Sequence, residues 1–166
     1  MGDDTTRPRG RLVVITGLPG SGKTTLATEL AASMPACRMC PDDWMMAAGI
    51  DLWDESVRAR IEAFQLTLAV DLLHAGSHVV IEWGAWTRVE RDALRDAARS
   101  IGAKVELRYV SAGTDALWRR IVGRDAEGRW GSRSIRRDEL DAWVGTYEPP
   151  TDKEFATYDS HTCTRT

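Results

Sequence analysis

A glycine-rich segment near the start of the chain has the pattern of a phosphate-binding loop. Residues 17–24 read Gly-Leu-Pro-Gly-Ser-Gly-Lys-Thr and match G-x-x-x-x-G-K-S/T. Glycines let the backbone wrap closely around phosphate oxygens, and the N–H groups of a following helix add positive potential. In such a loop the lysine reaches the β- and γ-phosphates, and the final hydroxyl ligates Mg²⁺. The predicted nucleotide-binding residues are Gly17, Pro19, Gly20, Ser21, Gly22, Lys23, Thr24 and Thr25.

Two adjacent carboxylates, Asp42 and Asp43, follow Lys23 by nineteen and twenty residues. They come directly after a short predicted strand, and the carboxyl ends of parallel strands share the edge of the sheet where ligands bind. A carboxylate at that edge can accept the proton of an attacking hydroxyl in line with a γ-phosphate. An aspartate can also cap the helix that follows. We therefore expect one of the pair to be catalytic and the other to cap the helix.

Arginines are concentrated between residues 119 and 137, where seven of them accompany two acids. The local charge of +5 contrasts with a net charge of −3 for the whole chain. Phosphoryl transfer needs cations over the developing charge, and a mobile lid that carries arginine supplies them on closure. Arg120 and Arg124 share one face of a predicted helix and lead into a predicted lid at about 124–134. We predict that both arginines contact the phosphates and assist catalysis.

The chain contains seven tryptophans, several of which follow predicted strands. A flat apolar wall suits a ring, a sugar face or a nucleobase, so these residues predict an acceptor pocket at the same edge. Glu82 ends another predicted strand, and we expect it to help hold Mg²⁺ through water or to bind an acceptor hydroxyl. The predicted acceptor-binding residues are Asp42, Asp43, Trp44, Glu82, Trp83, Trp86 and, in the lid, Trp130.

Strands and helices must alternate to bring these residues together. Apolar runs predict strands, and helical periodicity separates them, which favours a parallel sheet with right-handed crossovers. We expect a flexible N-terminus over 1–10, one domain over 11–150, and a polar, threonine-rich, loosely ordered tail over 151–166. No clear strand follows residue 150, so the sheet is predicted to have four strands, with a fifth left open. The predicted strands are 11–16, 36–40, 78–82 and 104–110, and the predicted helices are 23–34, 43–49, 54–75, 87–101, 114–123 and 135–146.

The composition is that of a globular protein. The 166 residues are 43% hydrophobic and 28% charged, which excludes a disordered or fibrous chain. A pI near 5.6 argues against a surface that grips nucleic acid everywhere. The first residues are polar rather than a signal peptide, and no stretch approaches the ~20 apolar residues that span a bilayer. We expect a cytoplasmic monomer or homodimer with no membrane partner.

Three motifs together resemble those of the P-loop kinase family that includes polynucleotide 5′-kinases, chloramphenicol phosphotransferase and zeta-toxin kinases. They are the loop at 17–24, Asp42-Asp43-Trp44, and Arg120 with Arg124. The resemblance covers about residues 11–150 and implies a three-layer P-loop NTPase fold with a parallel core, ATP and Mg²⁺. It also implies that Asp42 is the base and that Arg124 is the lid arginine on the transferring phosphate. Polynucleotide kinases place an arginine where this chain has Met45, which disfavours a nucleic-acid acceptor.

The sequence therefore predicts an ATP- and Mg²⁺-dependent kinase that phosphorylates a hydroxyl of a small molecule. The acceptor could be an antibiotic or another sugar- or ring-containing metabolite. One alternative is a polynucleotide 5′-hydroxyl kinase, in which the arginine-rich lid would grip phosphates. A further alternative is a regulator that binds ATP without catalysis.

Overall fold

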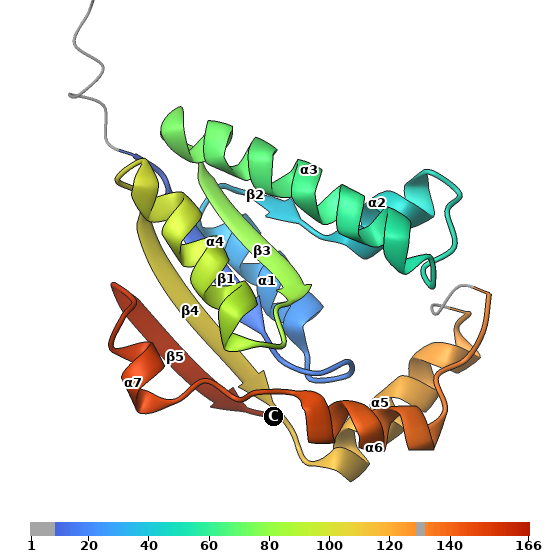
Figure 1. Cartoon of the computed structure of the whole chain (residues 1–166). Coiled ribbons are helices and arrows are strands. Elements are labelled where there is room, and N and C mark those ends of the chain that lie inside the picture. Colours follow the sequence, from blue (N-terminus) through green and yellow to red (C-terminus); the bar gives the residue numbers. More distant parts are fainter. Residues whose placement is uncertain (1–8, 129–131) are drawn as a thin grey trace, which may run out of the picture.

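Five parallel strands form the centre of the computed structural model, which describes residues 9–128 and 132–166 (Figure 1). The strand order is β2-β3-β1-β4-β5, so β1 lies between β3 and β4. The strands are β1 (Arg11–Thr16), β2 (Ala36–Met39), β3 (His78–Gly84), β4 (Lys104–Ser111) and β5 (Ser160–Arg165). The helices are α1 (Lys23–Ser33), α2 (Pro41–Ala47), α3 (Glu55–His74), α4 (Arg88–Ser100), α5 (Thr114–Ala126), α6 (Arg137–Thr146) and α7 (Asp152–Phe155).

Helices cover both faces of this sheet and give the molecule three layers. Alternate residues of β1 point to opposite faces, because side chains alternate along a strand. Leu12 and Val14 pack on one face with residues of α3, α4 and α7, whereas Val13 and Ile15 pack on the other face with α1. The predicted three-layer α/β fold with a parallel sheet is confirmed.

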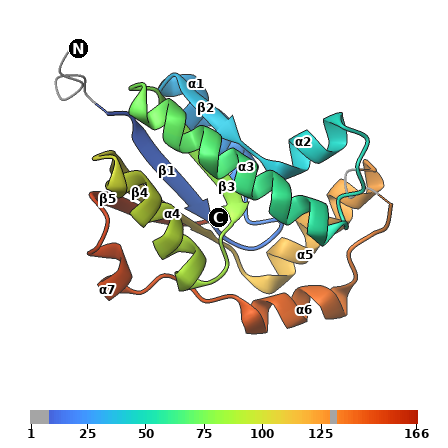
Figure 2. The ribbon, with the colours of Figure 1, turned by 45° about the horizontal axis from the view of Figure 1, so that its top comes forward.

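Two helices lie beyond the carboxyl ends of the strands, where α5 and α6 pack on each other (Figures 1 and 2). Their contact forms a separate apolar cluster around Leu117, Ile121 and Leu140. Leu18 of the glycine-rich loop packs against this cluster. The helix pair therefore borders the edge of the sheet at which the predicted site residues gather.

The sequence-based expectation of a loosely ordered tail is wrong. Residues 151–166 contain α7 and β5, and β5 pairs with β4 from Ser160 opposite Glu106 to Arg165 opposite Ser111. Phe155 and Tyr158 anchor this segment in the main core. The fifth strand has no run of apolar residues because it is an exposed edge strand held by backbone pairing.

The predicted lid begins inside a helix, since α5 continues to Ala126 and includes Arg124. Part of the predicted lid, including Trp130, lies outside the described residues, as does most of the predicted flexible N-terminus. No helix in the described ranges is both long and apolar enough to cross a membrane.

Candidate active site

The glycine-rich loop connects β1 to α1 at the carboxyl edge of the sheet. Gly20 has φ +81°, and a Cβ atom there would lie 2.9 Å from the Leu117 carbonyl oxygen, so the loop passes α5 too closely for a side chain. Gly22 has φ +105° and precedes the first residue of α1, whose N-terminus has no side-chain cap. The Lys23 ammonium donates to the Leu18 carbonyl over 3.0 Å. The loop thus presents uncapped helix N–H groups beside an ammonium, an arrangement suited to phosphate.

The two arginines predicted to contact phosphate have different places. Arg120 donates from Nη1 to the Gly20 carbonyl over 3.1 Å and to Thr166 Oγ1 over 2.8 Å. Thr166 Oγ1 in turn donates to the Ser21 carbonyl over 3.1 Å. Arg120 therefore braces the backbone of the loop from outside. Arg124 lines the cavity described next, and its charge, after burial, helps to lower the pKa of Lys23 to about 8.

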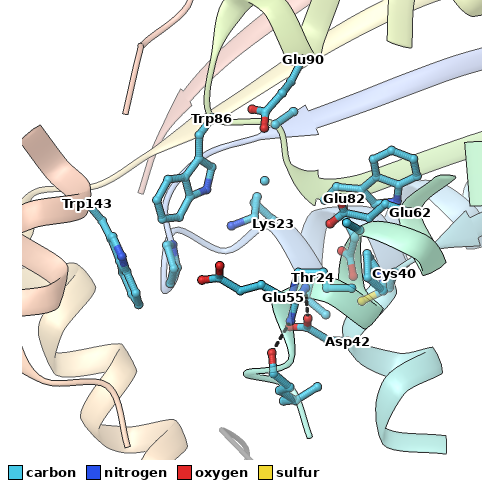
Figure 3. A pocket seen from close by; sticks show the side chains of 18 of the residues that line it. Lys23, Thr24, Cys40, Asp42, Glu55, Glu62, Glu82, Trp86, Glu90 and Trp143 are labelled. Atoms are coloured by element: carbon cyan, nitrogen blue, oxygen red, sulfur yellow. Dashed lines mark hydrogen bonds and ion pairs between the residues drawn. The ribbon is translucent and has the colours of Figure 1, made fainter. Parts of the chain in front are cut away.

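A cavity of about 700 Å³ opens beside the loop (Figure 3). It is bordered by the glycine-rich loop after β1, the residues that follow β2, the end of β3 and one face of α3. Gly17, Ser21 and Thr25 are not among its lining residues, and the Ser21 hydroxyl is buried. The predicted site residues that line the cavity are Pro19, Gly20, Gly22, Lys23, Thr24, Asp42, Glu82, Trp83, Trp86 and Arg124.

The two aspartates of α2 face different groups. Both lie in the first turn of the helix, after Pro41 at its first position. Neighbouring helical residues point about 100° apart, which turns the two carboxylates toward different neighbours. Asp42 lines the cavity, with Oδ1 2.6 Å from Nη1 of Arg58, whereas Asp43 pairs with Arg38. Neither caps α2 with its side chain, since the residue at the cap position is Cys40.

Glu82 stands at the end of β3, next to the strand that leads into the loop. Its Oε1 atom pairs with Arg38, and its Oε2 atom is buried and has no hydrogen-bond partner among the described residues. Burial raises the pKa of Glu82 despite the hydrogen bond with the Cys40 thiol and the attraction of Arg38, both of which lower it. A buried carboxylate oxygen without a partner at the cavity wall is a position where a ligand is needed.

Trp86 and Trp143 form the wall of the cavity that lies opposite Glu62 and Glu82. The rings of Trp86 and Trp143 meet edge to face, with centroids 5.7 Å apart, and Figure 3 shows them across the cavity from Glu62 and Glu82. Trp83 also lines the cavity and donates from Nε1 to Gln65 over 2.8 Å.

Trp44 does not belong to this wall, contrary to the sequence-based expectation. Its ring packs on Phe64 of α3, with centroids 6.1 Å apart, and borders the main core. Trp44 lies two positions after Asp42 in α2, so it points about 200° away from that carboxylate around the helix. The same rotation that turns Asp42 to the cavity therefore turns Trp44 to α3.

The sequence analysis missed a charged face of α3. Glu55, Arg58 and Glu62 line the cavity and are spaced by three and four residues, which places them on one side of the helix. Glu90 of α4 also lines it. The spacing was a usable signal, but charged residues at helical spacing are far more often a solvated face. Trp143 also lines the cavity and was not among the predicted acceptor-binding residues.

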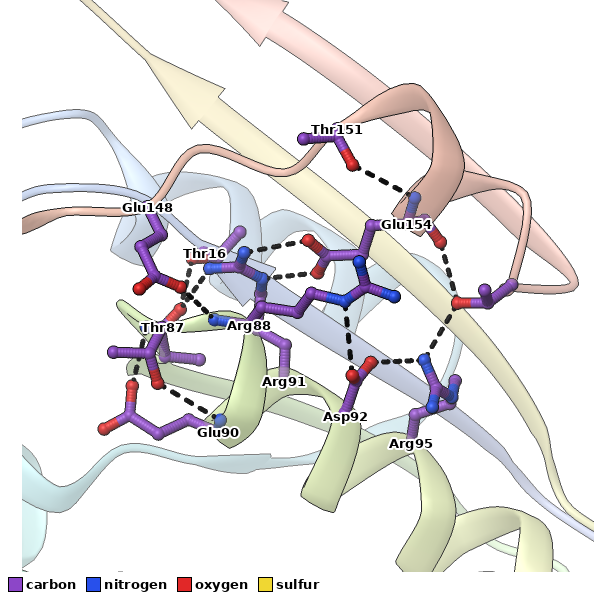
Figure 4. A network of polar contacts seen from close by, with 12 residues as sticks. Thr16, Thr87, Arg88, Glu90, Arg91, Asp92, Arg95, Glu148, Thr151 and Glu154 are labelled. Carbon is purple, nitrogen blue, oxygen red and sulfur yellow. Dashed lines mark hydrogen bonds and ion pairs between the residues drawn. The ribbon is translucent and has the colours of Figure 1, made fainter.

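The loop after β3 is held from the C-terminal side (Figure 4). Arg91 of α4 is fully buried and donates from Nη1 to the carbonyl oxygens of Ala85 and Trp86 over 3.0 and 3.2 Å. Glu154 of α7 accepts from Arg91, and the backbone N–H of Glu148 donates to the Trp86 carbonyl over 3.0 Å. These contacts fix the backbone that carries Trp86 into the cavity.

Comparison with known proteins agrees with this geometry. A family model described as an AAA domain (AAA_33) matches residues 12–150, which include the loop, Asp42, Glu82 and Arg124. The chain belongs to this family. No curated protein is similar enough in sequence to count as a relative of this AAA domain.

Solved structures share the fold of this AAA domain at low sequence identity. A protein of Chloroflexus aurantiacus described as a kinase has a TM-score of 0.74 and 23% identity, over 95% of this chain and 88% of that one. The APS kinase CysC of Mycobacterium tuberculosis, in complex with AMPPNP and APS, has a TM-score of 0.61 and 20% identity, over 94% and 89%. A chain of the Pnkp1/Rnl/Hen1 RNA repair complex has a TM-score of 0.73 and 17% identity, over 93% and 48%. The resemblance to P-loop kinases is confirmed at the level of the fold.

Proposed function

We propose that this AAA domain is an ATP- and Mg²⁺-dependent kinase that transfers the γ-phosphate to a hydroxyl of a small molecule. The observation that carries the proposal is that the Asp42 carboxylate and the Lys23 ammonium line one cavity. A phosphate site and a proton acceptor that share a cavity can place a hydroxyl beside a γ-phosphate.

Asp42 acts as the base in this proposal. The acceptor hydroxyl oxygen forms a bond to the γ-phosphorus while the bond from that phosphorus to the β–γ bridging oxygen breaks. The hydroxyl proton passes to the Asp42 carboxylate, and ADP leaves with the electron pair of the broken bond. Nη1 of Arg58, 2.6 Å from Oδ1 of Asp42, orients this carboxylate in the resting protein.

The residues at the loop fit the triphosphate and its metal ion. Lys23 and Arg124 would hold the phosphates, since both are cationic and both line the cavity beside the uncapped start of α1. Thr24 and the buried Glu82 offer the oxygen donors that Mg²⁺ prefers, Thr24 directly and Glu82 through water. When bound, the ion neutralises charge on the β- and γ-phosphates.

A polynucleotide 5′-hydroxyl kinase is the second candidate, favoured by the structural similarity to a chain of an RNA repair complex. The carboxylates of the cavity oppose it, because Glu55, Glu62 and Glu90 would repel a polyanion. The arginines after α5 also have partners within the protein: Arg133 pairs with Glu139, and Arg137 pairs with Asp115 and Asp141. The small-molecule acceptor is therefore the preferred class.

Transfer of radiolabelled γ-phosphate tests the proposal. The wild-type protein is screened with ATP and Mg²⁺ against hydroxylated antibiotics, nucleosides, sugars and 5′-hydroxyl oligonucleotides. Asp42→Asn should lower the transfer rate by roughly 10²–10⁴-fold while ATP still binds. Asp71→Asn, on the exposed side of α3, is the matched control and should retain full activity.

Three outcomes separate the candidates. Transfer to oligonucleotides alone would assign the polynucleotide activity. ATP binding without transfer to any acceptor would assign a non-catalytic regulator. Full activity of Asp42→Asn would reject the role of this carboxylate.

A further inference from the structure

The acceptor side of the cavity carries more negative charge than the proposed chemistry requires. Its lining contains the carboxylates of Asp42, Glu55, Glu62, Glu82 and Glu90. Asp42 has a role as the base and Glu82 faces the magnesium side. Glu90 accepts from the backbone N–H of Thr87 in the capping box of α4 and so has a structural role. Glu55 and Glu62 have no such role, and a neutral acceptor gives no reason for two further carboxylates.

Cations of the protein neutralise only part of this charge. Arg58 pairs with Asp42, and Arg38 pairs with Glu82 and Asp43. Lys23 and Arg124 lie at the phosphate end of the cavity, where a triphosphate would consume their charge. Arg58 also attracts Glu62, but this one cation lies beside both Asp42 and Glu62, so the Glu55 and Glu62 wall keeps a surplus of negative charge.

The carboxylates are close enough to oppose one another. Burial is the main cause that raises the pKa of Glu62, to about 7, and repulsion by Glu90 and Asp42 adds to it. Like charges gathered around one cavity are unfavourable unless a cation joins them. Oε2 of Glu82 is buried at the wall of the same cavity and accepts no hydrogen bond from the described residues, which leaves it available to a polar ligand.

The aromatic wall suits the same kind of ligand. Trp86 and Trp143 lie across the cavity from Glu62 and Glu82, edge to face (Figure 3). The face of an indole ring attracts an ammonium or guanidinium group, and the attraction increases when the cation loses water. A cavity with carboxylates on one wall and indole rings on the other binds cations that also carry apolar or ring surface.

We infer that the acceptor is a hydroxylated amine, whose ammonium group binds between the Glu55 and Glu62 carboxylates and the tryptophan wall while its hydroxyl faces Asp42. This inference rests on the proposed kinase function and narrows its substrate class. The ammonium is a binding group and stays unmodified. The hydroxyl takes the phosphate, and its proton goes to Asp42 as described above.

The test uses acceptors in matched pairs. A panel of hydroxylated amines, including 2-deoxystreptamine and larger aminocyclitol glycosides, is compared with the N-acetylated form of each compound, which keeps the hydroxyls and loses the charge. Binding to the full chain is measured by calorimetry in the presence of AMPPNP and Mg²⁺, and phosphoryl transfer is measured with ATP. At least one amine should bind ten or more times more tightly than its N-acetylated form, and added salt should weaken its binding.

Two variants test whether Glu55 and Glu62 cause the tighter binding of the amine. Glu62→Gln and Glu55→Gln should each weaken binding of that amine about tenfold, with little change for the N-acetylated form or for ATP. Glu29→Gln, on the exposed surface of α1, is the matched control and should change nothing.

Failure of this inference is distinguishable from failure of the proposed function. Equal or tighter binding of N-acetylated or anionic acceptors, or no binding by any amine, would overturn the inference, whereas phosphate transfer to neutral acceptors would leave the kinase in place. Selective amine binding without any transfer would support the cation site and reject the kinase.

Discussion

The Arg91 guanidinium and the Glu154 carboxylate form a two-point ion pair in the interior, with N–O distances of 2.6 and 2.9 Å. Their side chains are 0% and 1% exposed. The same guanidinium donates to the carbonyl oxygens of Ala85 and Trp86. One buried charge thus connects the C-terminal segment to the loop that carries a wall of the cavity.

Removal of one partner from this pair should destabilise the protein strongly. Glu154→Gln leaves the Arg91 charge buried without a counter-charge, and we expect the free energy of unfolding to fall by about 3–5 kcal/mol. Urea denaturation measures the change. The double variant Arg91→Met with Glu154→Leu should recover part of the loss, because it removes both charges.

The exposed pair of Arg136 and Asp138 provides a control for Glu154→Gln, since its side chains are 69% and 71% exposed. Asp138→Asn should leave the urea midpoint nearly unchanged because solvent screens that pair. If the free energy of unfolding of Glu154→Gln equalled that of the wild type, the buried pair would have no structural role.

Glu62 should make stability depend on pH. Burial raises its pKa in the folded protein from 4.5 to about 7. Between these values the folded chain holds a proton that the unfolded chain has released, so this group lowers stability progressively as pH rises from about 4.5 to 7. Above pH 7 the penalty is constant.

Glu62→Gln should therefore stabilise the protein at pH 8 and have little effect at pH 4.5. We expect a gain of about 1 kcal/mol at pH 8, because solvent still screens a half-buried carboxyl. Thermal unfolding at the two pH values measures it, with Glu29→Gln as the exposed control. An equal effect at both pH values would contradict the predicted titration of Glu62.

Substitution of Gly84 should weaken binding of the acceptor without weakening binding of ATP. This residue has φ +94°, and a Cβ atom there would lie 2.8 Å from Nε1 of Trp86. Gly84→Ala should shift the Trp86 ring and raise KM for the acceptor several-fold without a matching change in KM for ATP. Gly145→Ala, in α6 with open space around its Cβ position, is the control and should leave both constants unchanged.

Lys23→Ala should weaken nucleotide binding. The lost ammonium contributes charge-assisted hydrogen bonds to phosphate, and one or two of these correspond to roughly a tenfold to several-hundredfold change in affinity. Calorimetric titration with AMPPNP measures it. Lys104→Ala, at the exposed start of β4, should bind AMPPNP as the wild type does. If Lys23→Ala bound AMPPNP as tightly as the wild type, the glycine-rich loop would not be part of the nucleotide-binding site.

Much of the scaffold could be predicted from the sequence, because burial on both faces leaves a strong pattern. The runs 11–16 and 78–82 are rich in β-branched residues, and the run 104–110 alternates apolar and polar residues over most of its length. Each of the three predicted runs matches a central strand within two residues of its predicted end. β5 could not be predicted in this way. An edge strand exposed to solvent needs no apolar alternation, and its place is set by backbone pairing with β4.

The part of the candidate site whose backbone is fixed by a sequence motif could be predicted. The positions of side chains that depend on tertiary packing were harder to predict. The loop at 17–24 leads into α1 as predicted. Trp44 was misplaced, because the rotation of α2 about its axis was not known from the sequence. The contributions of Glu55 and Glu62 depend on which face of α3 is turned toward the sheet edge, and charged residues alone do not reveal that orientation.

The ion pair of Arg91 and Glu154 also orders events during synthesis. The two residues are 63 positions apart, and a ribosome releases the chain from its N-terminus. The glycine-rich loop and β1 to β4 are made before Glu148 and Glu154 are available to hold the loop after β3. Thr166, which contacts the glycine-rich loop, is made later still, so a nascent chain gains the contacts that fix both ends of its cavity only when the last segment has docked.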